Sequence, residues 1–62
     1  MKYLKTKEET RVYILGRLRE FKICRISSIN ALSWDENVLL STIKEMVEKK
    51  EIESDGNYLT II

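Results

Sequence analysis

Residues 27–50, SSINALSWDENVLLSTIKEMVEKK, carry the pattern on which the fold depends. They predict a short helix from about Ser28 to Leu32, a tight turn, and a longer helix that begins after Asp35. Asp35 is a favourable N-cap, because its carboxylate can accept hydrogen bonds from the free amides of the first helical turn. The longer helix has apolar residues at helical spacing, which predicts one buried face made of Leu39, Ile43, Met46 and Val47.

A polar strip stands on the longer helix, roughly 100–160° around the helix axis from Ile43. The strip consists of Asn37, Ser41, Lys44 and Glu48. Two helices, a tight turn and a polar strip on the second helix together predict a helix-turn-helix unit.

The turn and the short helix each carry a further prediction. Trp34 in the turn is predicted to be a buried wedge that sets the angle between the two helices, and its alternative role is stacking on a nucleic acid base. Ser27 or Ser28 is expected to cap the short helix. Backbone amides near these serines, at a helix N-terminus, can hold a phosphate.

Length and composition restrict the class of protein. Sixty-two residues predict a single domain over residues 1–62. Cys24 is the only cysteine and histidine is absent, so we expect no disulfide, no metal site and no cofactor. No nucleophile–base pair is visible, which predicts a protein that is not an enzyme and a buried Cys24. The lack of a secretion signal and of a bilayer-spanning apolar run predicts an intracellular, cytoplasmic protein.

Charge is distributed unevenly along the chain. Residues 1–31 carry eight lysines and arginines against three acids, a net charge of +5, whereas residues 32–62 carry three lysines against seven acids, a net charge of −4. Two interpretations stay open. The asymmetry is either ordinary surface charge or a basic face that meets nucleic acid phosphates.

The N-terminal part predicts an arm and a helix. Residues 1–5 are expected to be a flexible arm, with docking of Tyr3 and Leu4 as the alternative. Thr6 and Glu9 form a capping box at the start of a helix from about Lys7 to Glu20. The predicted buried stripe of this helix is Ile14, Leu15, Leu18 and Phe21, with Val12 at its edge. Tyr13 falls on the polar side, where it is either a simple exposed ring or the anchor of a homodimer interface.

The remaining segments predict strands. Residues 22–26 break the helical period and hold β-branched residues, which predicts a short strand. Residues 51–62 alternate around Asp55-Gly56, a strong signal for a two-residue hairpin turn. In that register Ser54 faces Asn57, Glu53 faces Tyr58 and Ile52 faces Leu59, and the residues turned to the core are Ile52, Leu59 and Ile61.

The order of helix, strand, helix, turn, helix and hairpin resembles the winged-helix transcription regulators that are typical of archaea, their plasmids and their viruses. Leu32 and Trp34 match the two apolar anchors of the family's turn, and Ser33 stands where glycine is usual. The recognition-helix core and the run leading into the wing are matched by Leu39, Ile43, Met46 and Lys49-Lys50-Glu51-Ile52. The resemblance implies an α+β winged-helix fold, with a three-helix helix-turn-helix core and a C-terminal hairpin wing.

The resemblance also implies a function, that of a sequence-specific regulator of transcription which binds double-stranded DNA, with a homodimer as the possible assembly. Base-edge contacts would come from Asn37, Ser41 and Lys44, with Glu36 and Leu40 alongside. Their chemistry fits, because asparagine pairs with adenine and lysine with guanine or phosphate. The implied phosphate contacts are Ser27, Ser28, Arg25 and Lys22.

The expected wing departs from this pattern, because it carries acids where DNA-reading wings usually carry lysine or arginine. These acids are Glu51, Glu53 and Asp55, and they would repel phosphates. The alternative is therefore a winged-helix module that docks a protein partner without binding DNA. In that case the residues to test would be Leu40, Tyr58 and Ile62.

Overall fold

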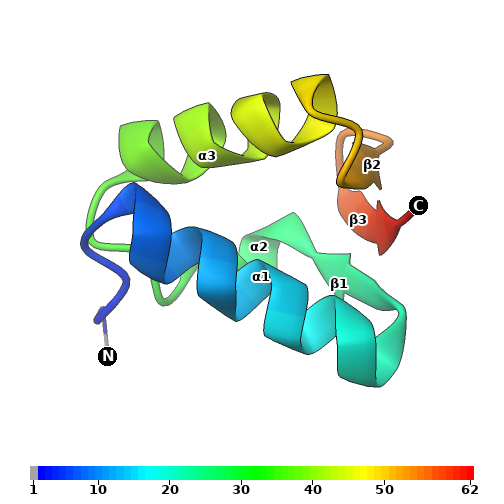
Figure 1. Cartoon of the computed structure of the whole chain (residues 1–62). Coiled ribbons are helices and arrows are strands. Elements are labelled where there is room, and N and C mark those ends of the chain that lie inside the picture. The colour runs from blue at the N-terminus through cyan, green and yellow to red at the C-terminus, as the bar shows by residue number, and fades with distance from the viewer. Residues whose placement is uncertain (1) are drawn as a thin grey trace.

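A computed structural model describes residues 2–62, so Met1, the first residue of the expected arm, lies outside the described part. The elements follow in the order α1 (Lys7–Phe21), β1 (Ile23–Arg25), α2 (Ile26–Asn30), α3 (Glu36–Glu48), β2 (Ile52–Ser54) and β3 (Tyr58–Ile61). The strands form one antiparallel sheet in the order β1-β3-β2. Figure 1 shows α3 lying above α1, with α2 and β1 behind α1 and the hairpin strands β2 and β3 to the right, below the end of α3. The predicted α+β class, with three helices and a C-terminal hairpin, is confirmed.

Helix α1 begins as its sequence predicts. The Thr6 hydroxyl accepts a hydrogen bond from the Glu9 N–H, and the Glu9 carboxylate accepts one from the Thr6 N–H, each over 3.1 Å. This reciprocal pair satisfies two of the amides that a helix start leaves free. Ile14 and Leu18 are fully buried as expected, but Phe21 is 51% exposed. The expectation for Phe21 is wrong because the core ends one turn earlier, and the Phe21 ring instead lies under the Arg17 guanidinium.

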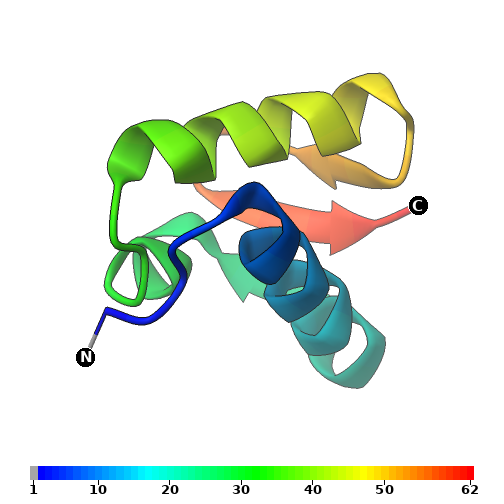
Figure 2. The ribbon, with the colours of Figure 1, turned by 60° about the vertical axis from the view of Figure 1, so that its left-hand side comes forward.

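The core lies between the three helices and one face of the sheet. Figure 2 shows α3 crossing above, the hairpin behind it, and α1 and α2 below. Every element supplies buried apolar side chains, namely Ile14, Leu18, Cys24, Ile29, Leu39, Ile43, Met46, Ile52 and Leu59, and Leu4 joins them from the N-terminal arm. Val47, which the periodicity also placed inside, is exposed because it lies on the far edge of the α3 stripe.

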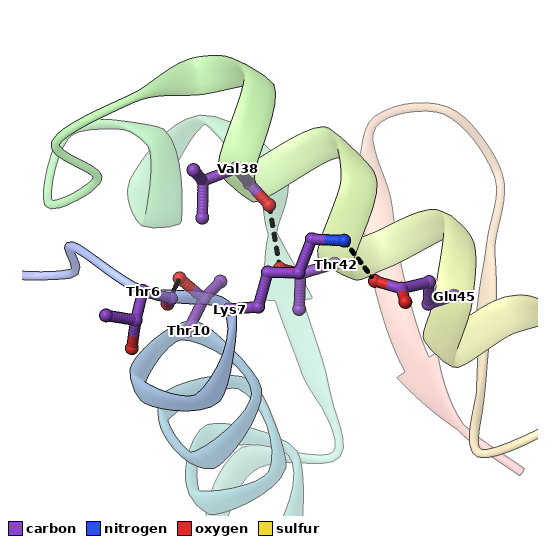
Figure 3. Close-up of polar contacts among 6 residues, drawn as sticks. All are labelled: Thr6, Lys7, Thr10, Val38, Thr42 and Glu45. Atoms are coloured by element: carbon purple, nitrogen blue, oxygen red, sulfur yellow. Dashed lines mark hydrogen bonds and ion pairs between the residues drawn. The ribbon is translucent and has the colours of Figure 1, made fainter.

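The contact between α1 and α3 includes polar groups (Figure 3). Thr10 and Thr42 are buried, and each hydroxyl donates to a carbonyl of its own segment, to Thr6 over 2.9 Å and to Val38 over 2.7 Å. Because both hydroxyls are satisfied, their burial carries no desolvation penalty from an unmade bond. Lys7 pairs with Glu45 across the same contact at 2.9 Å, and this hydrogen-bonded lysine holds the pKa of Glu45 below its ordinary value.

The N-terminal arm is docked rather than flexible in its described residues. Leu4 is only 2% exposed, its N–H donates to the Leu32 carbonyl, and its own carbonyl accepts the Trp34 N–H over 2.9 Å. Ser33 is buried opposite Leu4 in a short parallel bridge. The predicted burial of Trp34 is therefore wrong. Leu4 and Ser33 take the inward positions at this turn, and the Trp34 side chain is left 64% exposed.

The start of α2 also differs from the expected cap. The helix begins at Ile26, and its N-cap is Arg25, which makes no side-chain cap hydrogen bond. Strand β1 runs directly into α2, and the Ile26 N–H donates to the Asn57 carbonyl over 2.9 Å. Because the helix already includes Ile26, Ser27 and Ser28 lie inside its first turn, so neither of them is the cap.

The hairpin has a register different from the predicted one. Ile52 lies opposite Ile61, Glu53 opposite Thr60 and Ser54 opposite Leu59. The loop therefore consists of Gly56 and Asn57, because the Asp55 carboxylate accepts the N–H groups of Asn57 and Tyr58 over 3.0 and 2.7 Å. Such an aspartate turn places Asp55 before the loop rather than inside it. Ile52 and Leu59 still face the core as predicted, whereas Ile61 is 41% exposed at the sheet's end.

Gly56 has a positive φ of 99°, as a glycine in a two-residue hairpin turn requires. A Cβ built there would meet no atom within 4 Å, so Gly56→Ala is expected to cost about 1–2 kcal/mol of unfolding free energy through backbone strain alone. Gly16→Ala is the matched control. Gly16 sits inside α1, also with open space around it, so the same methyl group is expected to stabilise the protein by about 0.5–1 kcal/mol. Urea denaturation followed by circular dichroism measures both, and two changes of the same sign would contradict the prediction.

Candidate nucleic-acid interface

The polar strip of α3 lies on the side of the helix opposite its buried face. Asn37, Ser41 and Lys44 are all exposed, while Leu39 and Ile43 on the other side are buried. The first turn of the helix is held in place, because the Asp35 carboxylate accepts the backbone N–H of Asn37 over 2.8 Å. The predicted N-cap is thereby confirmed, and the strip is presented by a helix that is fixed to the core.

A groove of about 470 Å³ adjoins the strip, between the start of α2, the first half of α3 and the tip of the hairpin. It brings together four of the residues predicted for the site, Arg25, Ser27, Glu36 and Leu40. Asn57, which lines the same groove from the hairpin, was missed as a site residue, and Tyr58 beside it was named only for contact with a protein partner. The signal that could have found them is the pairing of β1 with β3, which sets Arg25 opposite Tyr58.

Arg25 is the central cation of this groove. Its guanidinium carbon lies 5.6 Å from the centroid of the Tyr58 ring, a distance at which a cation is attracted by the face of an aromatic ring. The side chain is exposed, and its backbone is held in place as the last residue of β1 and the N-cap of α2. The Tyr58 ring therefore holds an accessible guanidinium at the wall of the groove.

Two other predicted phosphate contacts are placed differently. Lys22 forms the left-handed C-cap of α1, with a φ of 69°, at the opposite end of β1 from Arg25. The groove lining includes Ser27 but leaves out Ser28, although Ser28 is exposed on α2. The structure thus brings Arg25 and Ser27 together with the start of α3 and leaves Lys22 outside this group.

The acids that argued against nucleic acid are largely engaged within the chain. Glu51 pairs with Arg11, and this hydrogen bond holds the pKa of Glu51 below its ordinary value. Asp55 faces the amides of its own turn, and these backbone hydrogen bonds likewise lower the pKa of Asp55. Among the ion pairs of residues 2–62 neither Glu36 nor Glu53 takes part. Of the three hairpin acids, only Glu51 is paired with a cation in the described part of the chain, and the lowered pKa keeps Asp55 ionised, so the repulsion expected from the hairpin comes from Glu53 and Asp55.

Trp34 is exposed just before the N-cap of α3. The Lys5 ammonium lies 5.4 Å from the centroid of the Trp34 ring. An aromatic ring with a cation over its face is able to contact a base or a sugar–phosphate chain. Because Trp34 is exposed, it is not a buried wedge. Stacking on a nucleic acid base, the alternative predicted from the sequence, stays a prediction.

The described part of the chain contains no group of three or more histidine, cysteine, aspartate and glutamate side chains that could hold a metal ion. None of its helices combines the length and the apolar character that crossing a bilayer requires. Comparison of the chain with protein-family models, curated proteins and solved structures found no match. The interface is therefore argued from its own residues.

Proposed function

We propose that this chain is a winged-helix protein that binds double-stranded DNA with α3 in the major groove and regulates transcription from a specific site. The observation that carries the proposal is the polar strip, of which Asn37, Ser41 and Lys44 are exposed hydrogen-bonding side chains in line on the outward face of a helix whose other face is the core. The order of elements supports it, since α2, a tight turn and α3 form a helix-turn-helix unit and β1 joins the hairpin to the helices.

Each part of the surface has a distinct role in this proposal. Asn37 pairs with the edge of an adenine, Ser41 with any base edge in reach, and Lys44 with guanine or with phosphate. Arg25, held against Tyr58, binds a phosphate beside the groove. Trp34 and Lys5 contact the sugar–phosphate chain at the start of α3. Contacts to phosphate position the protein, and contacts to bases select the sequence.

A second candidate function rests on exposed apolar side chains, one at the groove and one at the far end of β3. Leu40 is 48% exposed at the rim of the groove, and Ile62 at the C-terminal end of the sheet is also exposed. Such side chains suit a protein partner better than a phosphate backbone. The two functions differ in salt dependence, because DNA binding releases counterions in proportion to the phosphates neutralised.

The proposal is tested by measuring affinity for random duplex DNA at several salt concentrations. We expect the logarithm of the affinity to fall linearly with the logarithm of salt, and Arg25→Ala to reduce that slope by about 0.9 because one phosphate contact is lost. Lys22→Gly is the matched control. It also removes one positive charge, and glycine keeps the left-handed backbone of this position, so the slope is expected to stay near that of the unmodified protein. Absence of binding at low salt would favour the interaction module.

A further inference from the structure

The outward face of α1 is uncovered in the described structure. Figure 1 shows α1 at the front of the molecule, with α2 and β1 behind it. The inward side of the helix carries Thr10, Ile14 and Leu18, all fully buried, while Val12 on the outward side is 59% exposed. A hollow of about 450 Å³ lies along the first half of this face, lined mainly by apolar atoms. An uncovered apolar surface of this kind suits a protein contact.

One edge of this face carries charged and apolar side chains in a definite order. Glu8, Val12, Leu15 and Arg19 follow at intervals of four, three and four residues, so at 100° per residue they lie within about 60° of arc. Leu15, which was predicted to be buried, is only half-buried, with one side packed against the core. We call these four residues the α1 stripe. Read along the helix, the stripe is acid, apolar, apolar, base, which becomes base, apolar, apolar, acid when read in the opposite direction.

We propose that two copies of this chain pair through the α1 stripe, antiparallel about a two-fold axis. In this pairing Glu8 meets Arg19 of the partner subunit, and Val12 meets Leu15 of the partner subunit. The two-fold axis repeats both contacts, as it does in any isologous interface. A parallel pairing would instead set Glu8 against its own copy and Arg19 against its own copy, which repels.

The charges of the α1 stripe are available for this contact. The ion pairs found among residues 2–62 are Lys7 with Glu45 and Arg11 with Glu51, so neither Glu8 nor Arg19 takes part in one there. The neighbouring aromatic side chain is already in use, because the Tyr13 ring stacks on Tyr3 with centroids 6.3 Å apart. The pairing therefore falls on the stripe rather than on the tyrosine.

The charges on the other edge of α1 disfavour pairing along that edge. That edge carries Glu9, Tyr13, Gly16 and Glu20, and an antiparallel pairing along it would bring Glu9 close to Glu20 of the partner subunit. Like charges that face each other suppress such a pairing. A stripe of four residues on each copy is short, and interfaces at the low end of the size range are weak. We therefore expect a dimer that dissociates on dilution.

The test is sedimentation equilibrium of the purified protein without DNA, over a wide range of concentration, so its result does not depend on the proposed DNA binding. We expect the unmodified chain to shift reversibly from monomer to dimer. Glu8→Arg and Arg19→Glu, each alone, are expected to raise the dimer dissociation constant by about tenfold or more, because each sets two like-charged pairs across the axis. The double variant Glu8→Arg/Arg19→Glu is expected to restore dimerisation with the charges reversed.

Glu20→Arg is the matched control, because it makes the same change of charge on the other edge of α1 and is expected to leave the dissociation constant within about twofold. Circular dichroism of each variant at the assay temperature checks that the chain is folded. A chain that stays monomeric at every concentration would overturn the proposal. So would a folded double variant that dimerises no better than the two single variants.

Discussion

Leu4→Ala is expected to lower the free energy of unfolding by about 2–5 kcal/mol, although Leu4 stands in the arm before the first helix. The side chain is 2% exposed and belongs to the core cluster, so its truncation removes buried apolar surface and leaves a cavity. The backbone around it bonds to Leu32 and Trp34 on the turn before α3. Urea denaturation followed by circular dichroism measures the loss.

Trp34→Ala is the control for this prediction, and we expect it to change the free energy of unfolding by less than about 1 kcal/mol. Tryptophan is larger than leucine, but the Trp34 side chain is 64% exposed. The hydrogen bond to Leu4 uses the backbone N–H, so the alanine variant keeps it. For a chain of this size each kcal/mol moves the midpoint of thermal unfolding by about 4–8 °C, so the two variants are easily told apart. If Trp34→Ala lowered the free energy of unfolding more than Leu4→Ala, Trp34 would be the buried wedge after all, and the docking of the arm would be contradicted.

The features that were predictable from the sequence are local ones. The Thr6–Glu9 capping box and the Asp35 cap depend on residues within one helical turn of each other, and both are present. The spacing of Leu39 and Ile43 identified the buried face of α3, because a helix repeats regularly over its 13 residues. In each case the residues that form the feature also stand close together in the chain.

The features that were not predictable depend on residues distant in the sequence or on a choice between similar turns. Nothing near Trp34 shows that Leu4, 30 positions earlier, occupies the space beneath the turn. Likewise α2 starts at Ile26 because its N–H meets the carbonyl of Asn57, a hairpin residue. The loop register was missed because Asp55-Gly56 and Gly56-Asn57 are both good turn pairs, and the Asp55 side chain decided between them.

The candidate interface also combines a local feature that was predictable from the sequence with a long-range contact that was not. The polar strip was predicted from the period of a single helix. Asn37, Ser41 and Lys44 are exposed along one face of α3, as that period predicts. The contact of Arg25 with Tyr58 requires the pairing of β1 with β3, two short strands whose register no local pattern specifies.

Asn37→Ala is expected to weaken binding to the preferred DNA site by about 1–3 kcal/mol and to leave binding to random duplex nearly unchanged. The reason is that a side-chain amide offers a donor and an acceptor to the edge of adenine, and such a contact discriminates among bases without adding to the phosphate term. The substitution does not disturb the helix, because alanine is the best helix former and the bond between Asp35 and Asn37 uses the backbone N–H.

The preferred site would first be selected with the unmodified protein from a library of random duplexes, and both variants would then be compared on that site and on a scrambled one. Glu20→Ala is the control, since it truncates an exposed polar side chain on α1, a helix that does not line the groove, and is expected to leave discrimination between the two duplexes intact. Equal losses on both duplexes would mean that Asn37 positions the backbone rather than reads a base. No loss on either would mean that α3 does not enter the groove, and the exposed Leu40, with Tyr58 and Ile62, would then be tested against a protein partner.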